Sequence, residues 1–204
     1  MGIDMATTDA PFGFRPWGNV LSANIYAIVT AYGTAVYIGD AMEIGGTAIT
    51  TKIYGTIQNC QVEDTGAAGS MLGAVLGLFT STGEPTPYIA ASTTGDSVVA
   101  GYALIADHPL QKYIVAEDGD TSSIQVANVG LNVEGISTNS GDTNTGQSKM
   151  EIDSNTVNTT STLAWKILGV HPDDTISAAG AAGNHCRFIV MPNSSHAASN
   201  IDGA

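Results

Sequence analysis

The sequence has 204 residues, with 6 Lys and Arg against 19 Asp and Glu and a formal net charge of −13. This charge repels nucleic-acid phosphates and anionic membrane surfaces, so we expect no direct binding to nucleic acid or to a membrane. Charged residues make up only 12% of the chain, about half the usual share, which is typical of a surface that neighbouring subunits cover.

The composition predicts an all-β fold. Glycine contributes 24 residues, Thr and Ser are abundant, and the long polar residues that cover helix surfaces are scarce, so the propensities favour strands and turns. A chain of this length buries about 70% of its unfolded surface and holds a single core. We expect a barrel- or sandwich-like antiparallel domain over residues 19 to 192, with an extended N-terminal arm at residues 1 to 18 and a polar C-terminal tail at residues 193 to 204.

The first nine residues lack the basic region and apolar run of a secretory signal. No later window has the 18 uninterrupted apolar residues of a membrane-spanning helix. We therefore expect a chain that is made in a reducing compartment and carries no targeting segment.

Residues 10 to 17 contain three aromatic side chains separated by Pro and Gly, which favour extended and turning backbone. Two interpretations of this segment stay open. The rings cap the chain's own core, because aromatic rings are large burial units wherever they lie. Alternatively, the segment docks onto a neighbouring subunit, with the rings as anchors and the guanidinium paired with a carboxylate. The residues of that predicted docking segment are Pro11, Phe12, Phe14, Arg15 and Trp17.

The strongest strand pattern lies at Thr34 to Ile44, where bulky residues alternate around a predicted bend at Gly39 and Asp40. We expect this strand to face the core on one side. Shorter apolar or alternating runs precede and follow it, joined by Gly-containing turns, and together they predict a β-meander. These flanking runs cover residues 24 to 30, 47 to 54 and 56 to 62.

The most apolar segment is Met71 to Thr80, for which a helix and a buried strand compete. Gly73, Gly77 and the turn-rich sequence that follows favour the buried strand. Short β-branched or aromatic runs then recur at the spacing of sandwiches and barrels. They cover residues 98 to 105, 112 to 116, 124 to 133, 163 to 170 and 185 to 191.

Between these runs, residues 136 to 161 are rich in Asn, Thr, Ser and Gly and predict an exposed polar excursion, with one short element at residues 150 to 152. Cys60 and Cys186 fall within expected strands. Buried free thiols are the favoured interpretation, and a single disulfide stays open because a sequence does not give their separation.

The sequence contains no recognisable catalytic, metal-binding or phosphate-binding motif. The four histidines, at positions 108, 171, 185 and 196, show no metal-ligand spacing, and the sequence around His171 predicts a turn made by Pro172, Asp173 and Asp174. Asp118, Gly119 and Asp120 lack the ligand series of a calcium loop, and nucleophile and phosphate-binding signatures are missing. We therefore predict no catalytic residues, no cofactor and no metal site, and do not expect an enzyme.

Three stretches resemble a group of small virion proteins of tailed bacteriophages: A-T-T-D-A-P-F-G-F-R-P at residues 6 to 16, A-V-Y-I-G-D at 35 to 40 and L-A-W-K-I-L-G-V at 163 to 170. These proteins are regarded as capsid decoration or head-stabilising proteins. The resemblance implies a β-rich fold, self-association that is often trimeric, and contact with the major capsid protein on the capsid surface. It also implies assembly in the cytoplasm of a bacterial host, and no cofactor or catalytic residue.

The function that we expect is therefore a structural one, an auxiliary decoration protein that stabilises the phage head. Two alternatives stay open. One is another head or tail subunit, including a minor or major capsid protein. The other is a carbohydrate-binding or hydrolytic β domain, which predicts a solvent-facing row of aromatic rings with paired carboxylates nearby, in which we place Tyr32, Tyr37 and Tyr88.

Overall fold

The computed structural model describes residues 9 to 63, 71 to 120, 123 to 138, 141 to 174, 185 to 193 and residue 195. Within this part of the chain the fold is all-β and the named strands pair antiparallel, with two single-turn 3₁₀ segments, η1 (Val126–Asn128) and η2 (Ser154–Thr156). The described residues contain no helix long and apolar enough to span a membrane.

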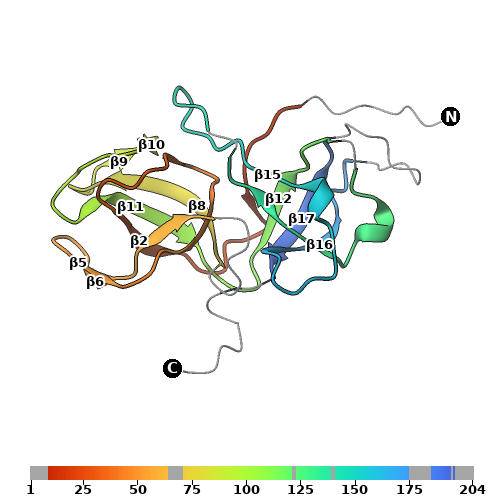
Figure 1. Cartoon of the computed structure of the whole chain (residues 1–204), viewed down its shortest axis with the longest axis horizontal. Helices are drawn as coiled ribbons and strands as arrows, with labels where there is room; N and C mark the ends of the chain where they lie inside the picture. The colour runs from red at the N-terminus through yellow and green to blue at the C-terminus, as the bar shows by residue number, and fades with distance from the viewer. Residues whose placement is uncertain are drawn as a thin grey trace.

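The first of the two main sheets lies on the left in Figure 1 and has the order β2-β11-β8-β4-β7, with β9 paired to β8. Its longest strands, β8 and β11, pair along most of their length. Because β8 lies between β11 and β4, it is buried over most of its length. The bounds are β2 (Asn24–Val29), β4 (Ala41–Ile44), β7 (Cys60–Val62), β8 (Met71–Thr80), β9 (Pro85–Thr86) and β11 (Val99–Ala106).

The second main sheet lies on the right in Figure 1 and has the order β1-β12-β17-β16-β13, so β1 and β13 are its edges. The N-terminal strand β1 pairs with β12, with Trp17 opposite Lys112. The bounds are β1 (Arg15–Trp17), β12 (Lys112–Ala116), β13 (Asn132–Val133), β16 (Trp165–Val170) and β17 (Arg187–Pro192).

Three two-stranded ribbons complete the structure. The ribbon of β5 and β6 forms a hairpin at the left-hand end of the molecule in Figure 1. The other two ribbons pair strands that are distant in the sequence. The pairs are β3 (Val36–Tyr37) with β10 (Tyr88–Ile89), β5 (Ile49–Thr51) with β6 (Gly55–Ile57), and β14 (Gly135–Ile136) with β15 (Glu151–Ile152).

One hydrophobic cluster spans both sheets. Tyr113 of β12 links them, because its ring packs edge-on against Trp165 with centroids 5.4 Å apart, while its hydroxyl donates to the carbonyl oxygen of Ala106 at the end of β11. Burial raises the pKa of the Tyr113 hydroxyl, which therefore stays protonated and keeps this bond.

The buried-strand prediction is confirmed for β8, whose bounds match the predicted segment. The strand predicted at residues 112 to 116 is also confirmed, as β12. The predicted bend in Thr34 to Ile44 is also confirmed: β3 and β4 are separated around Gly39, which has φ = 94°. The expectation that this strand buries only one face is wrong, because Ala41, Met42 and Glu43 are consecutive buried residues. Cys60 and Cys186 are both buried and not joined by a disulfide, as expected.

The predicted meander is wrong. Among its strands, β5 and β6 are sequence neighbours that pair, as a hairpin, whereas β2 pairs with β11, and β4 pairs with β7 and β8. The strand predicted at residues 124 to 133 is also wrong, because η1 and a turn occupy most of it and only β13 is extended. Pairing between distant segments determines which residues form strands and which strands are neighbours, and the local alternation of residue types does not predict that pairing.

The polar excursion at residues 136 to 161 is only partly exposed. Gly146 and Ser148 bond to the backbone of Ile38, and Met150 and Ile152 are fully buried. The predicted arm, residues 1 to 18, joins the second sheet through β1, while residues 1 to 8 lie outside the described residues. Of the predicted tail, residues 193 and 195 alone are described, and Ser195 is buried.

Candidate functional site

Phe14, a predicted docking anchor, lies in the chain's own core. Its side chain is fully buried and stacks on Trp165, with ring centroids 4.2 Å apart and an interplanar angle of 17°. Its backbone N–H donates to the carbonyl oxygen of Gly39 at 2.8 Å. The prediction that Phe14 anchors a partner is corrected accordingly, because its ring already fills a site between the two sheets.

The remaining members of the predicted docking segment lie nearer the surface. Pro11 and Phe12 are half-buried, and Arg15 is exposed, with its guanidinium carbon 4.9 Å from the centroid of the Phe12 ring. Arg15 also donates to the Gln147 side-chain oxygen at 3.3 Å. Trp17 is exposed at the sheet edge, and its ring meets His171 edge-on with centroids 4.9 Å apart. Docking of this exposed part onto a partner stays a prediction.

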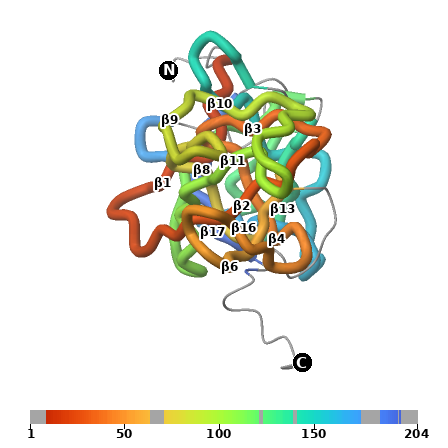
Figure 2. Tube along the Cα trace, turned by 90° about the vertical axis from the view of Figure 1, so that its left-hand side faces the viewer, coloured from red at the N-terminus to blue at the C-terminus, as the bar shows by residue number. Residues whose placement is uncertain are grey.

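Trp17 belongs to a larger exposed apolar group, which we call the edge surface. Its members are Trp17, Val20, Leu21 and Leu110, which are 38%, 45%, 55% and 61% exposed. The two segments meet because β1 pairs with β12 and the N–H of Leu21 donates to the side-chain oxygen of Gln111 at 2.9 Å. Figure 2 shows the red segment after β1 projecting from the body of the molecule.

Asp107 fixes this projecting segment. Its two carboxylate oxygens accept from the hydroxyl of Ser22 and the side-chain amide of Asn24, both at 2.7 Å, and from the hydroxyl of Tyr26 at 2.8 Å. Hydrogen bonds to a charged acceptor are about twice as strong as neutral ones. The exposed leucine of the β1–β2 connection is therefore held in place by the loop that carries Leu110.

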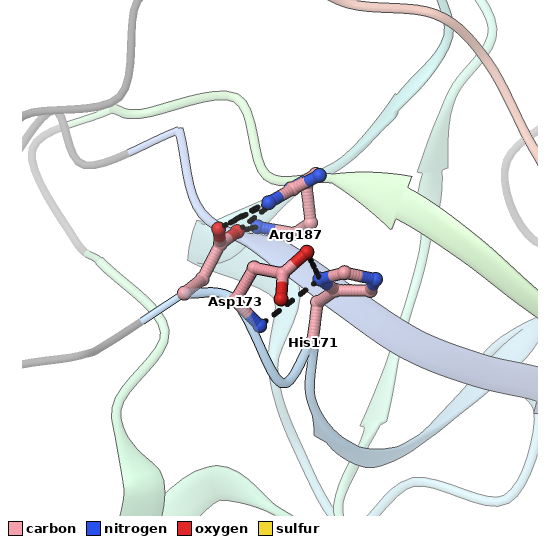
Figure 3. A network of polar contacts seen from close by, with 4 residues as sticks. His171, Asp173 and Arg187 are labelled. Atoms are coloured by element: carbon pink, nitrogen blue, oxygen red, sulfur yellow. Dashed lines mark hydrogen bonds and ion pairs between the residues drawn. The ribbon is translucent and has the colours of Figure 1, made fainter.

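The ring of His171, which packs edge-on against Trp17, belongs to a network of polar contacts that Figure 3 shows from close by. The sequence around it forms the predicted turn, with the N–H of Asp174 donating to the carbonyl oxygen of His171 at 2.9 Å. Asp174 accepts from Arg187 side-chain nitrogens at 2.6 and 3.0 Å. Burial raises the pKa of Asp174, but these hydrogen bonds outweigh it and the pKa is lowered overall. Figure 3 shows that this ion pair and the contact between His171 and Asp173 hold one turn, as expected for a structural role.

Sequence reasoning missed Val20, Leu21 and Leu110. The available signal was weak: Val20 and Leu21 follow Gly18 and Asn19, and Leu110 follows Pro109. An isolated apolar residue in a turn is common at protein surfaces. Only the pairing of β1 with β12 brings the two turns to one place.

A separate pocket of about 530 Å³ lies between β3, the end of β7 and the chain after β14. Two tyrosine rings and two carboxyl groups line it, together with an amide and hydroxyl groups. The N–H of Tyr37 donates to Asp40 Oδ2 at 2.7 Å, and the N–H of Val62 donates to the Tyr32 hydroxyl at 3.0 Å. Its principal polar lining residues are Tyr32, Thr34, Tyr37, Asp40, Gln61 and Glu63.

The carboxyl groups of this pocket are buried, and their pKa values are raised. Burial raises the pKa of Asp40 to about 6 and that of Glu63 to about 8. Glu63 accepts a hydrogen bond from Trp165 Nε1 at 3.2 Å. Burial also raises the pKa of the nearby Glu134 carboxyl group. The nearby Glu134 carboxyl group also raises the pKa of Glu63, since two neighbouring negative charges are unfavourable.

The row of solvent-facing aromatic rings proposed for Tyr32, Tyr37 and Tyr88 is wrong. Tyr37 is only 5% exposed, and it stacks on Tyr88 with centroids 5.6 Å apart. Tyr32 and Tyr37 line the pocket instead, beside Asp40 and Glu63. This arrangement suits a small polar molecule better than an extended chain lying across an open surface.

Comparisons of the chain with protein-family models, with curated proteins and with solved structures find no match.

Proposed function

We propose that this chain is a structural subunit of a phage head, a decoration protein that binds the major capsid protein and copies of itself on the outer surface of the capsid. Its resemblance to virion proteins supports this function, as do the scarcity of charged residues and the exposed apolar groups. The particle assembles in the cytoplasm of a bacterial host. The protein acts by covering surface and holding neighbouring subunits together.

The observation that carries the proposal is the edge surface. Here, hydrogen bonds hold a group of apolar side chains in a position where they face solvent. Such a group is typical of a binding surface. Fully burying one leucine side chain contributes about 1.5–3 kcal/mol. Repetition over many symmetric copies multiplies this contribution through avidity.

The charges beside the edge surface indicate what kind of partner surface it would bind. Arg15 and Lys112, two of the six cationic residues of the chain, are exposed on β1 and β12 beside Trp17. The rest of the molecule is strongly acidic. A partner surface with carboxylates around an apolar centre therefore matches this part of the molecule, and complementary charge favours both orientation and rapid association.

Binding to capsids that lack this chain tests the proposal. Leu110→Asp places a charge at the most exposed residue of the edge surface, and we expect it to abolish binding or weaken it at least about tenfold. Val126→Asp is the matched control, because Val126 is 57% exposed but lies in η1. Equal binding by Leu110→Asp and the wild type would refute the role of the edge surface.

Two further measurements separate the structural alternatives. Sedimentation of the purified chain should show an oligomer, and a strictly monomeric species at high concentration would count against self-association. Stoichiometry in purified particles distinguishes a decoration protein from a minor or major capsid protein or a tail subunit.

A second candidate function rests on the pocket. We propose that Tyr32, Tyr37, Asp40 and Glu63 bind a saccharide, because rings and hydrogen-bonding groups in one pocket suit a polyhydroxylated ligand. Titration with host polysaccharide fragments tests binding, and product analysis tests hydrolysis. Tyr32→Ala should weaken binding, whereas Tyr54→Ala, an exposed tyrosine outside the pocket, should not. Failure of all fragments to bind would exclude this candidate.

A further inference from the structure

Three side chains of the kinds that bind metal ions meet at one place. They are Asp9, Glu151 of β15 and His185, which immediately precedes Cys186 and β17. One potential ligand atom from each lies within 4.8 Å of the other two. The group is formed by chain segments far apart in the sequence, which is why no spacing motif revealed it.

The imidazole of His185 is held in a fixed position. The backbone of Gly119 lies against its ring, and a Cβ at this position would approach the ring atoms to 2.4–2.6 Å. Only glycine leaves room for the ring there. His185 itself has φ = 41°, a left-handed conformation that is uncommon for a residue with a side chain. The chain thus accepts an unfavourable backbone conformation at the position that directs this imidazole.

The ring nitrogen that faces the carboxylates is available as a ligand. His185 Nδ1 is buried and makes no hydrogen bond to any residue that the structure describes. Asp9 Oδ1 lies 3.9 Å from His185 Nδ1, within the range of an ion pair but too far for a hydrogen bond. A buried nitrogen acceptor normally has a partner, so this position calls for one.

The two carboxylates contribute differently. Glu151 is buried on β15, so its carboxylate is shielded from bulk solvent. Asp9 has a side chain that is 64% exposed, so it leaves the site open to solvent on one side. An ion therefore has a route of entry, and water has room to complete its coordination.

We propose that Asp9, Glu151 and His185 bind a divalent transition-metal ion of the Zn²⁺ type. Zinc binds imidazole nitrogen and carboxylate oxygen at about 2.0–2.2 Å, which places two ligand atoms on one ion roughly 3.3 Å apart. Small side-chain movements from the present spacing reach this geometry. An imidazole ligand favours Zn²⁺ over Ca²⁺ and Mg²⁺, which prefer oxygen ligands alone. The bound ion would join Asp9, at the start of the described chain, to the strands of the second half.

Calorimetric titration of the full chain, prepared without a histidine tag and treated with a chelator, tests this proposal. We expect one saturable Zn²⁺ site and a rise in the unfolding temperature with Zn²⁺, because a ligand that binds only the folded state stabilises it. Ca²⁺ should produce neither effect. Binding by Ca²⁺ equal to that by Zn²⁺ would overturn the assignment of metal type.

Two variants localise the site. Asp9→Asn, at an exposed position, and His185→Asn, which tolerates a left-handed backbone, should each weaken Zn²⁺ binding about tenfold or more. Asp173→Asn is the matched control, since Asp173 is also an exposed aspartate beside a histidine, His171, at 3.7 Å. The absence of saturable binding, or binding that Asp9→Asn and His185→Asn leave unchanged, would refute the site.

Discussion

The ring of Phe14 lies almost parallel to the indole of Trp165, with centroids 4.2 Å apart. This contact joins the N-terminal segment to β16, and Trp165 also touches Tyr113 of β12 and donates to Glu63 beyond β7. Phe14, directly before β1, is therefore part of the core. Deleting residues 1 to 17 would remove Phe14 as well, so point substitutions give a clearer test of docking.

Phe14→Ala should lower the free energy of unfolding by about 3–5 kcal/mol, because it leaves a cavity against Trp165. Phe12→Ala is the matched control, since Phe12 is half-buried, and it should cost about 1 kcal/mol. Urea denaturation followed by tryptophan fluorescence measures both. Similar losses for the two variants would contradict the central place of Phe14.

Gly73→Ala should destabilise β8 strongly. A Cβ at Gly73 would lie 1.9 Å from the carbonyl oxygen of Ala106 and 2.4 Å from the Tyr113 hydroxyl, so the junction of the two sheets has no room for it. Gly77→Ala lies in the same strand with no atom within 4 Å of the added Cβ and should change stability by less than about 1 kcal/mol. Thermal unfolding of the two variants compares them, and equal unfolding temperatures would disprove the close packing.

Glu63→Gln should flatten the dependence of stability on pH. Folding raises the pKa of Glu63 from 4.5 to about 8, so between these values the folded chain keeps a proton that the unfolded chain releases. The stability from this group is complete below pH 4.5 and declines as the pH rises toward 8. The slope is at most about 1.4 kcal/mol per pH unit for one proton.

Urea unfolding at intervals from pH 5 to pH 8 measures this effect. Gln at position 63 keeps an acceptor for Trp165 but does not titrate in this range. Glu84→Gln, at an exposed position, is the control and should leave the wild-type dependence unchanged. If Glu63→Gln keeps the full wild-type slope, the buried carboxyl pair is not its source.

Asp174→Ala should cost about 2–4 kcal/mol, because it leaves Arg187 without the buried carboxylate that it contacts at 2.6 Å. Asp173→Ala changes the neighbouring carboxylate, whose side chain is 75% exposed, and should cost less than about 0.5 kcal/mol. Chemical denaturation compares the two. A larger loss for Asp173→Ala would show that the turn beneath Trp17 is held by a different contact.

Local patterns were enough to predict the all-β class and several strands. β8 was predictable because continuous apolar residues between turn signals indicate a buried strand, and the break at Gly39 was predictable because glycine permits the bend. The strand order was not, since β2 pairs with β11 across about seventy residues and nothing in either strand encodes its partner. The prediction of a strand at residues 124 to 133 failed because β-branched side chains also occur in exposed turns such as η1.

The candidate sites were less predictable than the fold. Phe14 and Trp17 look alike in the sequence, yet Phe14, directly before β1, is buried, whereas Trp17, at the end of β1, is exposed. Leu21 and Leu110 form one surface only through the pairing of β1 with β12. The proposed ligands Asp9, Glu151 and His185 are also distant in the sequence, as are Asp40 and Glu63 in the pocket, and each group meets only in the folded chain.

The most direct test of the proposed function is a density map of an assembled particle. We predict density for this chain on the outside of the capsid, with Trp17, Leu21 and Leu110 buried against a neighbouring subunit. Particles that lack the chain, or density in which these three side chains all face solvent, would contradict the account.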